Sequence, residues 1–556
     1  MSRPSIWERN LLALSVNHPE LGRLITRTDP SANVRMLDSR SGLKVPVYLG
    51  KGRPVQMHST VDPETEGRRF FQNYGGAGYL VFLGLGGGYQ VRPFIDSSDS
   101  ARIIIVEKEL AFVRAVLQQI DMRPVLLDPR VRLLAGESAQ SIKDFLLSDY
   151  LPAIYGDLKT VPLRPSVEAG GPYYTQLIQS IRDLIGMVAD DYTVQAQFGK
   201  KWYVNTLANL PAVQKSTVTV KPVQRAFITG AGPSLEAQIP RLRDMRETGF
   251  LIASDTSLPA LLRYRITPDL VISIDCQLVS YHHFLQGMPD RSPLLLDLAS
   301  PPVLTRLSQH SAFFTSSHPL SLYLSARWRH LPYIDTSGGN VSHAAVSVAE
   351  FLGARQIYLL GIDFSYPEGK AYCRNTYLYP LFRSQESRLD PLESLFLSFI
   401  LKNATIMKDR IQGALRYTTR PLIGYKERLE RYLQSWDAEV IPLPGKGVPL
   451  ELKPKAKARR EGQQPGQILA AGAPKMDWRE FLSGYLRDLE ALPRPCSPIS
   501  RYLYELDEAE RSLWLTLYPA AAAFREHDRR DQTREHLLLS RVRDWSIEVA
   551  RRFLDR

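Results

Sequence analysis

Cysteine is scarce in this sequence of 556 residues, and long apolar runs are missing. Its three cysteines, Cys276, Cys373 and Cys496, are widely scattered and show neither the spacing of a zinc-binding pair nor that of a disulfide framework. No window approaches about 18 uncharged apolar residues, which excludes a membrane-spanning helix. Residues 1–30 carry charges throughout and lack the apolar core of a signal peptide. We therefore expect a cytoplasmic protein without a transmembrane segment.

Acidic residues are fewer than basic ones, 58 against 70, which gives a formal net charge of +12. Such an excess suits nucleic acid, an anionic membrane surface or a phosphorylated small substrate. Part of it lies in "KPKAKARREG" (453–462), which we interpret as a solvated linker. Charge alone therefore selects no function, and we expect no nucleic-acid partner.

The length predicts roughly three or four structural units. Near the end of the chain, "DWREFLSGYLRDLEAL" and "REHLLLSRVRDWSIEVARRFL" place apolar residues at helical spacing beside charged faces, which predicts helices. Strand and helix signals alternate before them. We predict an N-terminal Rossmann-like domain (1–195), a central α/β domain (196–450), a polar linker (451–475) and a helical C-terminal domain (476–556).

A glycine-rich turn dominates the first domain. The apolar run 79–83 leads into Gly84, Gly86, Gly87 and Gly88, and a second apolar run ends on Glu107. A strand, a glycine turn, a helix and an acidic residue about 20 positions on form the layout of a dinucleotide or adenosyl-cofactor site. The same pattern also occurs in layers that bind nothing, and no catalytic set accompanies it here.

The central domain contains six short, continuous apolar runs separated by helical segments. Continuous runs are typical of parallel strands that are covered on both faces, so the fold class we predict is α/β with two doubly wound domains. The runs are "RAFITG" (225–230), "GFLIAS" (249–254), "DLVISID" (269–275), "PLLLDLA" (293–299), "SAFFTS" (311–316) and "QIYLLGID" (356–363).

Ligands of such sheets bind beyond the carboxyl ends of the strands, so the residues at these ends are candidates. The first strand runs into "TGAGPSLEAQI", where a helix start reached through glycines forms a ready anion site and is our predicted phosphate cradle. The second and third strands end in polar residues suited to sugar or base recognition, although helix or loop capping explains them about equally well. These candidates are Gly230, Gly232, Pro233 and Ser234, then Ser254, Asp255 and Thr256, and then Asp275 and Gln277.

The stretch "TSGGNVSHAAVSVAEFLGARQIYLLGIDFSYPEG" (336–369) supplies a glycine pair directly before a further helix. Backbone N–H groups in the first turn of a helix lack partners, which makes ligand binding easy there. His343 also fits a packed core histidine. The candidates are Ser337, Gly338, Gly339, Asn340, Ser342 and His343.

With these segments in order, the central domain resembles that of the motility-associated factor (Maf) flagellin glycosyltransferases, a domain shared with 6-hydroxymethylpterin diphosphokinase MptE-like proteins. The resemblance rests on "GAGPSL", "IASDTSLPALL", "ITPDLVISIDCQ", "SGGNVSHAA" and "LGARQIYLLGIDFSY". The segments "VFLGLGGGYQ" and "IIIVEKELAFVRAVL" are similar to the preceding Rossmann-like domain of Maf proteins.

The central domain also looks like bacterial sialyltransferases that use CMP-activated nine-carbon acidic sugars. This resemblance implies that "GAGPS" and "TSGG" hold CMP, and that a pseudaminic or legionaminic acid is transferred to serine or threonine of flagellin, for flagellar assembly and motility. Tyr333, just before "TSGG", is then a candidate hydrogen-bond donor to the departing phosphate, or simply a core aromatic.

The chain departs from these relatives at the catalytic base. The resemblance implies a histidine after "GIDF", but none occurs between His343 and His527, and Tyr372 stands where Maf relatives often carry one. A base needs hydrogen-bond reach and a suitable pKa. Our candidates are Asp363, Tyr372 and His343, with Glu368 and His318 as further options.

Two other functions stay open. One is an ATP-dependent 6-hydroxymethylpterin diphosphokinase, which would require Mg²⁺ held by carboxylates such as Asp275 and Asp363. The other is a protein that binds flagellin or a nucleotide sugar without catalysis.

Overall fold

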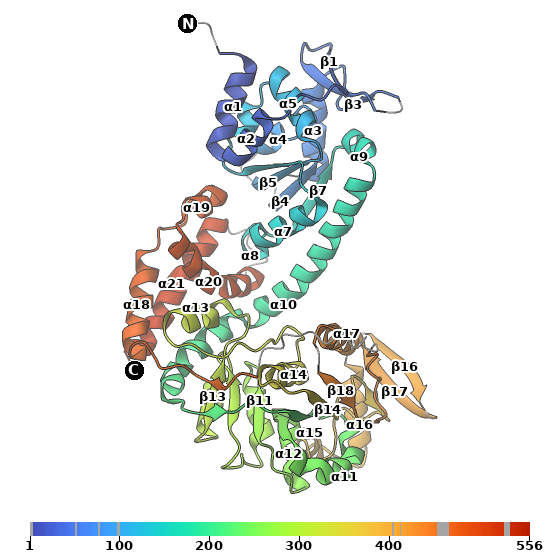
Figure 1. The fold of residues 1–556 in the computed structure, drawn as a ribbon, viewed down its shortest axis with the longest axis vertical. Helices are drawn as coiled ribbons and strands as arrows, with labels where there is room; N and C mark the ends of the chain where they lie inside the picture. Colours follow the sequence, from blue (N-terminus) through green and yellow to red (C-terminus); the bar gives the residue numbers. More distant parts are fainter. Residues whose placement is uncertain are drawn as a thin grey trace. The chain divides into compact units, whose positions relative to one another are not determined.

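The computed structural model describes residues 4–50, 53–75, 78–96, 100–402, 405–411, 413–436, 438–452, 466–527 and 534–555. The chain forms two compact units, Met1–Gly199 with Ala491–Ser546, and Lys200–Glu490 with Ile547–Arg556 (Figure 1). The predicted helical C-terminal region is confirmed, and its residues are divided between the two units. Most of the predicted linker, including 453–462, lies outside the described residues. Within the described part, no helix is long and apolar enough to span a membrane.

The first unit is built on a parallel sheet with the strand order β6-β5-β4-β7. Its strands are β4 (Gly78–Leu83), β5 (Ser100–Glu107), β6 (Val131–Ala135) and β7 (Leu158–Pro162), and a small antiparallel sheet comprises β1 (Val34–Asp38), β2 (Lys44–Tyr48) and β3 (Val55–Gln56). The helices before residue 171 are α1 (Ile6–Asn17), α2 (Pro19–Thr26), α3 (Pro63–Tyr74), α4 (Arg92–Ile95), α5 (Leu110–Gln119), α6 (Arg123–Leu126), α7 (Ala139–Asp149), α8 (Pro152–Tyr155) and α9 (Arg164–Gly170).

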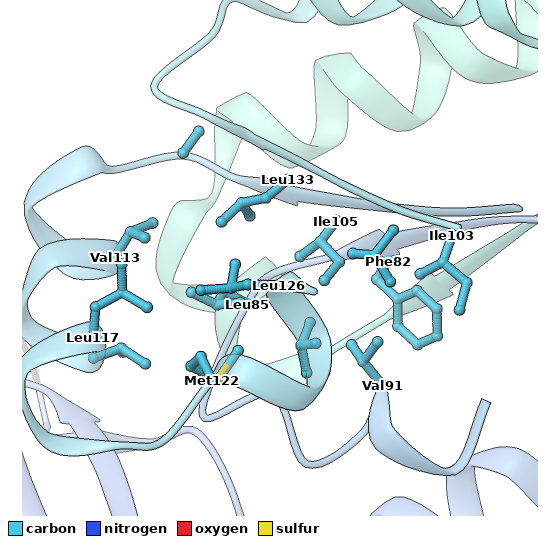
Figure 2. Packing of buried hydrophobic residues seen from close by; sticks show 14 of the residues in the cluster. Phe82, Leu85, Val91, Ile103, Ile105, Val113, Leu117, Met122, Leu126 and Leu133 are labelled. Atoms are coloured by element: carbon cyan, nitrogen blue, oxygen red, sulfur yellow. The ribbon is translucent and has the colours of Figure 1, made fainter. Parts of the chain in front are cut away.

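Apolar burial holds this sheet and its helices together. In Figure 2, Phe82 and Ile105 from the strands point toward the same core as Val113 and Leu117 from α5. All four are fully buried. Burying each such side chain contributes about 1.5–3 kcal/mol, so the continuous apolar runs of β4 and β5 select the interior of the sheet.

Four long helices are divided between the two units. They are α10 (Pro172–Lys215), α18 (Trp478–Ala491), α20 (Glu508–His527) and α21 (Glu535–Leu554), with the shorter α19 (Ile499–Glu505) between α18 and α20. In the first unit, α20 packs on α8, and Arg525 donates hydrogen bonds to the carbonyl oxygens of Ala153 and Ile154.

The second unit contains a seven-stranded parallel sheet with the order β13-β12-β11-β10-β9-β14-β18. The strands are β9 (Arg225–Thr229), β10 (Phe250–Ser254), β11 (Leu270–Ser273), β12 (Leu294–Asp297), β13 (Ser311–Phe314), β14 (Gln356–Leu360) and β18 (Glu439–Pro442). The chain adds β10 to β13 stepwise on one side of β9 and then returns to place β14 on the other side. The topological switch point, where ligands of such sheets bind, therefore lies between β9 and β14.

Helices cover both faces of this sheet. Ile228 and Ile252 pack with α14 (Val341–Phe351) on one face, while Phe227 and Leu251 pack with α11 (Leu235–Met245) and α12 (Leu258–Arg263) on the other. The predicted doubly wound α/β class is confirmed. The remaining elements are β8 (Thr219–Val220), η1 (Arg246–Thr248), η2 (Asp255–Ser257), η3 (Leu278–Phe284), η4 (Pro302–Arg306), α13 (Pro319–Arg327), β15 (Tyr366–Pro367), α15 (Leu378–Arg383), α16 (Leu392–Leu401), β16 (Ile406–Ile411), β17 (Ala414–Thr419), α17 (Arg420–Gln434) and β19 (Leu469–Ala470).

Candidate functional site

The two strand ends at the switch point lie in direct backbone contact. Gly232 donates a hydrogen bond from its N–H to the carbonyl oxygen of Gly361, at 2.8 Å. A Cβ atom on Gly361 would lie 2.4 Å from the carbonyl oxygen of Gly230, and Gly361 has a φ of 61°. Glycine is therefore required here because the backbones of β9 and β14 approach so closely.

A carboxylate of the chain itself lies at the start of α11. The N–H of Ser234 donates to Oδ2 of Asp363 at 2.8 Å, and the Ser234 hydroxyl accepts from the N–H of Lys446 at 2.9 Å. Asp363 is 6% exposed, and burial raises its pKa although the Ser234 N–H lowers it. A phosphate bound by Gly230, Gly232, Pro233 and Ser234 would have to replace Asp363 at this N–H. The predicted cradle stays a prediction.

The start of α14 reaches the same sheet edge. Asn340 caps the helix by accepting from the His343 N–H at 3.0 Å, and Ser342 Oγ lies 3.2 Å from where a Cβ on Gly230 would be. Arg428 donates to the carbonyl oxygen of Gly338 and so brings a positive charge to this loop.

His343 packs inside that loop. Its Nε2 lies 3.3 Å from Oδ2 of Asp335, and this contact is the main reason why the pKa of Asp335 falls to about 2. Ser337 donates its N–H to the other carboxylate oxygen of Asp335 at 2.8 Å. A Cβ on Gly338 would lie 2.2 Å from the imidazole, while Gly339 faces Tyr425. These contacts give the loop a fixed shape and His343 a structural partner.

A polar cluster lies beyond the ends of β10 and β11. Asp255 is 4% exposed and accepts from the Ser273 hydroxyl at 2.6 Å and from the Thr256 hydroxyl at 3.0 Å. Thr256 Oγ1 also lies 3.5 Å from Nε2 of His283, at the outer limit of a hydrogen bond. Ser254 caps the turn by accepting from the Ser257 N–H.

Asp275 and two tyrosines complete this cluster. Burial and the nearby charge of Asp255 raise the pKa of Asp275, which accepts from the Gln277 N–H at 2.9 Å. The rings of Tyr377 and His283 meet edge to face, with centroids 4.8 Å apart. Burial, and next the adjacent Tyr377, raise the pKa of Tyr372.

His283 and Tyr377 are functional candidates that the sequence reasoning missed. The available signal was "SYHHF" directly after the third strand, but the expected base was sought after "GIDF". His283 is 9% exposed, and its Nδ1 has no hydrogen-bond partner among the described residues. Buried polar atoms without a partner are uncommon in folded proteins and call for a functional explanation.

The other predicted residues lie apart from this cluster. The backbone of Tyr333 pairs with Thr315, beyond β13 at the far edge of the sheet, and its side chain is 50% exposed. His318 packs on Trp202, with ring centroids 4.0 Å apart. Glu368 forms a surface ion pair with Lys446. Within the described part of the chain, no three His, Cys, Asp or Glu side chains are grouped as metal ligands.

The glycine turn of the first unit is closed by its own neighbours. The N–H of Gly87 donates to Nε2 of His58 at 2.8 Å, and the N–H of Leu85 donates to Glu107 at 3.0 Å. Burial raises the pKa of Glu107 to about 7. The cavity beside Glu107 measures about 30 Å³, which holds one or two water molecules but not a nucleotide. The turn is thus held by the chain's own side chains, and a dinucleotide site there stays a prediction.

Sequence relatives match the central part of the chain. Residues 204–369 match the family model "6-hydroxymethylpterin diphosphokinase MptE-like". An uncharacterised Treponema pallidum protein is 37% identical over 153 residues, 27% of this chain and 54% of its own length. A second one is 32% identical over 167 residues, 29% of this chain and 79% of its own length. A 6-hydroxymethyl-7,8-dihydropterin pyrophosphokinase of Pyrococcus furiosus is 28% identical over 159 residues, 27% of this chain and 59% of its own length. The chain thus spans about half the length of the first relative.

One solved structure matches nearly the whole chain. The MAf glycosyltransferase from Magnetospirillum magneticum AMB-1 covers 99% of this chain, and the match covers 95% of that chain, with a TM-score of 0.58 and 15% identity. At this identity the likeness shows the fold, and it confirms the Maf-like architecture that the sequence motifs implied.

Proposed function

We propose that this chain, which belongs to one family with its second Treponema relative and has the fold of a Maf glycosyltransferase, transfers a sugar from an activated donor to a protein. The finer proposal is transfer of a pseudaminic- or legionaminic-type acid from a CMP-sugar to serine or threonine of flagellin, for flagellar assembly and motility. The observation that carries the catalytic part is His283, a buried histidine with an unpartnered nitrogen among Asp255, Asp275 and Tyr377.

His283 is suited to remove the proton from the acceptor hydroxyl. The single hydroxyl proton of Thr256 is donated to Asp255, so Thr256 Oγ1 meets Nε2 of His283 as an acceptor and favours a proton on Nε2. Nδ1 then carries the lone pair. The acceptor proton moves to Nδ1, the acceptor oxygen bonds to the anomeric carbon of the sugar, and the bond from that carbon to the phosphate oxygen breaks.

The other base candidates already have structural partners. Asp363 accepts from the Ser234 N–H, and the pKa of Tyr372 is raised mainly by burial, which opposes its ionisation. Among the described residues, Nδ1 of His343 is unpartnered like that of His283, but Nε2 of His343 contacts Asp335 and Gly338 packs closely on its ring. Their assignment as the base stays a prediction, and His283 is our preferred choice.

We assign the departing CMP phosphate to the start of α14. Backbone N–H groups of the first helical turn and the positive helix end favour an anion there. Arg428 donates a hydrogen bond to the carbonyl oxygen of Gly338. Its positive charge would stabilise the negative charge that develops on the departing phosphate. Asp275 and Gln277 both follow β11 and would contact the base or the sugar.

Two measurements test this function. CMP should raise the unfolding temperature of the protein more than equimolar ATP does, because a ligand that binds only the folded state stabilises it. Incubation with CMP-pseudaminic or CMP-legionaminic acid and recombinant flagellin should add the sugar mass to flagellin. His283→Gln should lower turnover by about 10²–10⁴-fold, whereas His282→Gln, the exposed neighbour, should not. Unchanged flagellin mass with both donors would contradict the proposal.

The family model favours pterin diphosphokinase activity as the second candidate. The proposed Mg²⁺ ligands follow two different strands of the sheet. Asp275 follows β11 and Asp363 follows β14, and the strands β10 and β9 lie between these two. Stabilisation by ATP with Mg²⁺, but not by CMP, together with AMP release on addition of 6-hydroxymethylpterin, would support this activity. CMP binding without any change of flagellin mass would favour a non-catalytic binding protein.

A further inference from the structure

A cavity of about 1030 Å³ lies in the second unit, and its lining includes Gln286, three residues after His283. Its apolar lining comes largely from α15 and α16 and includes Tyr379, Phe396 and Leu397. Charged residues of both signs line it as well, among them Arg383 and Glu393. The lining of the cavity therefore combines apolar side chains with both acidic and basic ones.

One hydrogen bond links the cavity wall to the two segments that carry the candidate catalytic cluster. Gln286, which lines the cavity, donates to the carbonyl oxygen of Asn375 at 3.3 Å. Gln286 lies three residues after His283, just beyond the end of η3 at Phe284, and Asn375 lies two residues before Tyr377. This hydrogen bond therefore joins the two segments that carry the His283 and Tyr377 pair, and it does so at the cavity wall.

Three non-glycine residues between 364 and 375 adopt left-handed backbone conformations. Phe364, Glu368 and Asn375 have φ values of 47°, 56° and 71°. Left-handed conformations are costly for residues other than glycine, and such strain concentrates at binding and catalytic sites. Glu368 and Asn375 both line the cavity.

We propose that this cavity binds the segment of the acceptor polypeptide that presents its hydroxyl to His283, a proposal that rests on the proposed transfer function. The size is at or above the upper end of small-molecule sites. A lining that mixes apolar side chains with charges of both signs is typical of a protein-binding surface, and it lacks the concentrated positive charge expected of a phosphate site. An apolar side chain of the acceptor would contact Leu397 on the cavity wall.

The test compares two exposed helical leucines. Leu397 lines the cavity and is 37% exposed, whereas Leu322 on α13 is 42% exposed and lies outside it. Leu397→Glu should raise the KM for recombinant flagellin by at least about tenfold, and Leu322→Glu should leave it unchanged. Release of CMP from the CMP-sugar without flagellin should be equal in both variants and the wild type.

Arg383→Glu is a second variant at an exposed position, which guards against misfolding of the first. It should also raise the KM for flagellin. An unchanged KM for flagellin in both cavity variants would overturn the inference. A wild-type dimer that Leu397→Glu dissociates would also overturn it, because a second copy of the chain would then occupy the cavity. If the wild type neither binds CMP nor releases it from the donor, the proposed function itself fails, which is a distinct result.

Discussion

The N–H of Ser234 and the carboxylate of Asp363 form a 2.8 Å hydrogen bond across the switch point of the main sheet. Both residues are buried. Gly447 packs on the backbone of Asp363, where a Cβ would lie 2.5 Å from Cα. The chain thus supplies its own anion at a helix start that, in many nucleotide-binding folds, is left to a phosphate.

Asp363→Ala should destabilise the second unit. The buried Ser234 N–H would lose its acceptor, which costs about 1–3 kcal/mol of unfolding free energy. Asp363→Asn retains an acceptor oxygen and should lose less. Urea unfolding measures both, with exposed Asp290→Ala as the control. Equal midpoints for Asp363→Ala and Asp290→Ala would contradict a structural role of the carboxylate.

Glu107 should make the first unit less stable as the pH rises. Its pKa of about 7 in the fold exceeds the usual 4.5, so its protonated form is favoured by folding. The resulting stabilisation is complete below pH 4.5 and is lost as the pH rises through 7, a change of about 3 kcal/mol. Glu107→Gln cannot titrate. The difference in unfolding free energy between wild type and variant should therefore change across pH 4.5–7.5 in urea titrations, and a constant difference would refute the buried-acid interpretation.

Gly86 should tolerate alanine less well than Gly42 does. Both have positive φ values, 52° and 79°, so both substitutions carry a similar backbone cost of about 1–2 kcal/mol. A Cβ on Gly86 would also lie 2.4 Å from Nε2 of His58, whereas one on Gly42 meets nothing within 4 Å. Thermal unfolding should show a larger loss for Gly86→Ala. Equal losses would mean that the contact between the turn and His58 does not constrain it.

Strands of the main sheet were predictable where burial was complete. The six continuous apolar runs correspond to β9 to β14, because a strand covered on both faces must be apolar throughout. β18 was missed. Its residues are half-buried or exposed and include Pro442, as is typical of a sheet edge, so hydrophobicity gives little sign of it.

The candidate site was harder to predict because its contacts are long-range. Asp363 and Ser234 were both identified at strand ends, but they are 129 residues apart, and their pairing depends on β14 lying next to β9. His283 lies on a 3-10 segment, η3, whose turn has no apolar periodicity. His283 is a candidate because it contacts the hydroxyl of Thr256 and the ring of Tyr377, and only the folded chain brings these two residues to it.

Thr256 provides the sharpest test of the catalytic proposal. Thr256→Val keeps the side-chain shape but removes the hydroxyl that links Asp255 to Nε2 of His283. The imidazole would lose the partner that favours its reactive tautomer, so kcat should fall by about tenfold or more while the KM for the CMP-sugar stays the same. Thr256→Ser retains the hydroxyl and should restore most of kcat. If Thr256 has a purely structural role, Thr256→Val should lower the unfolding temperature without a selective loss of kcat. Normal turnover of a folded Thr256→Val enzyme would exclude the hydrogen-bonded series Asp255, Thr256 and His283 from the reaction.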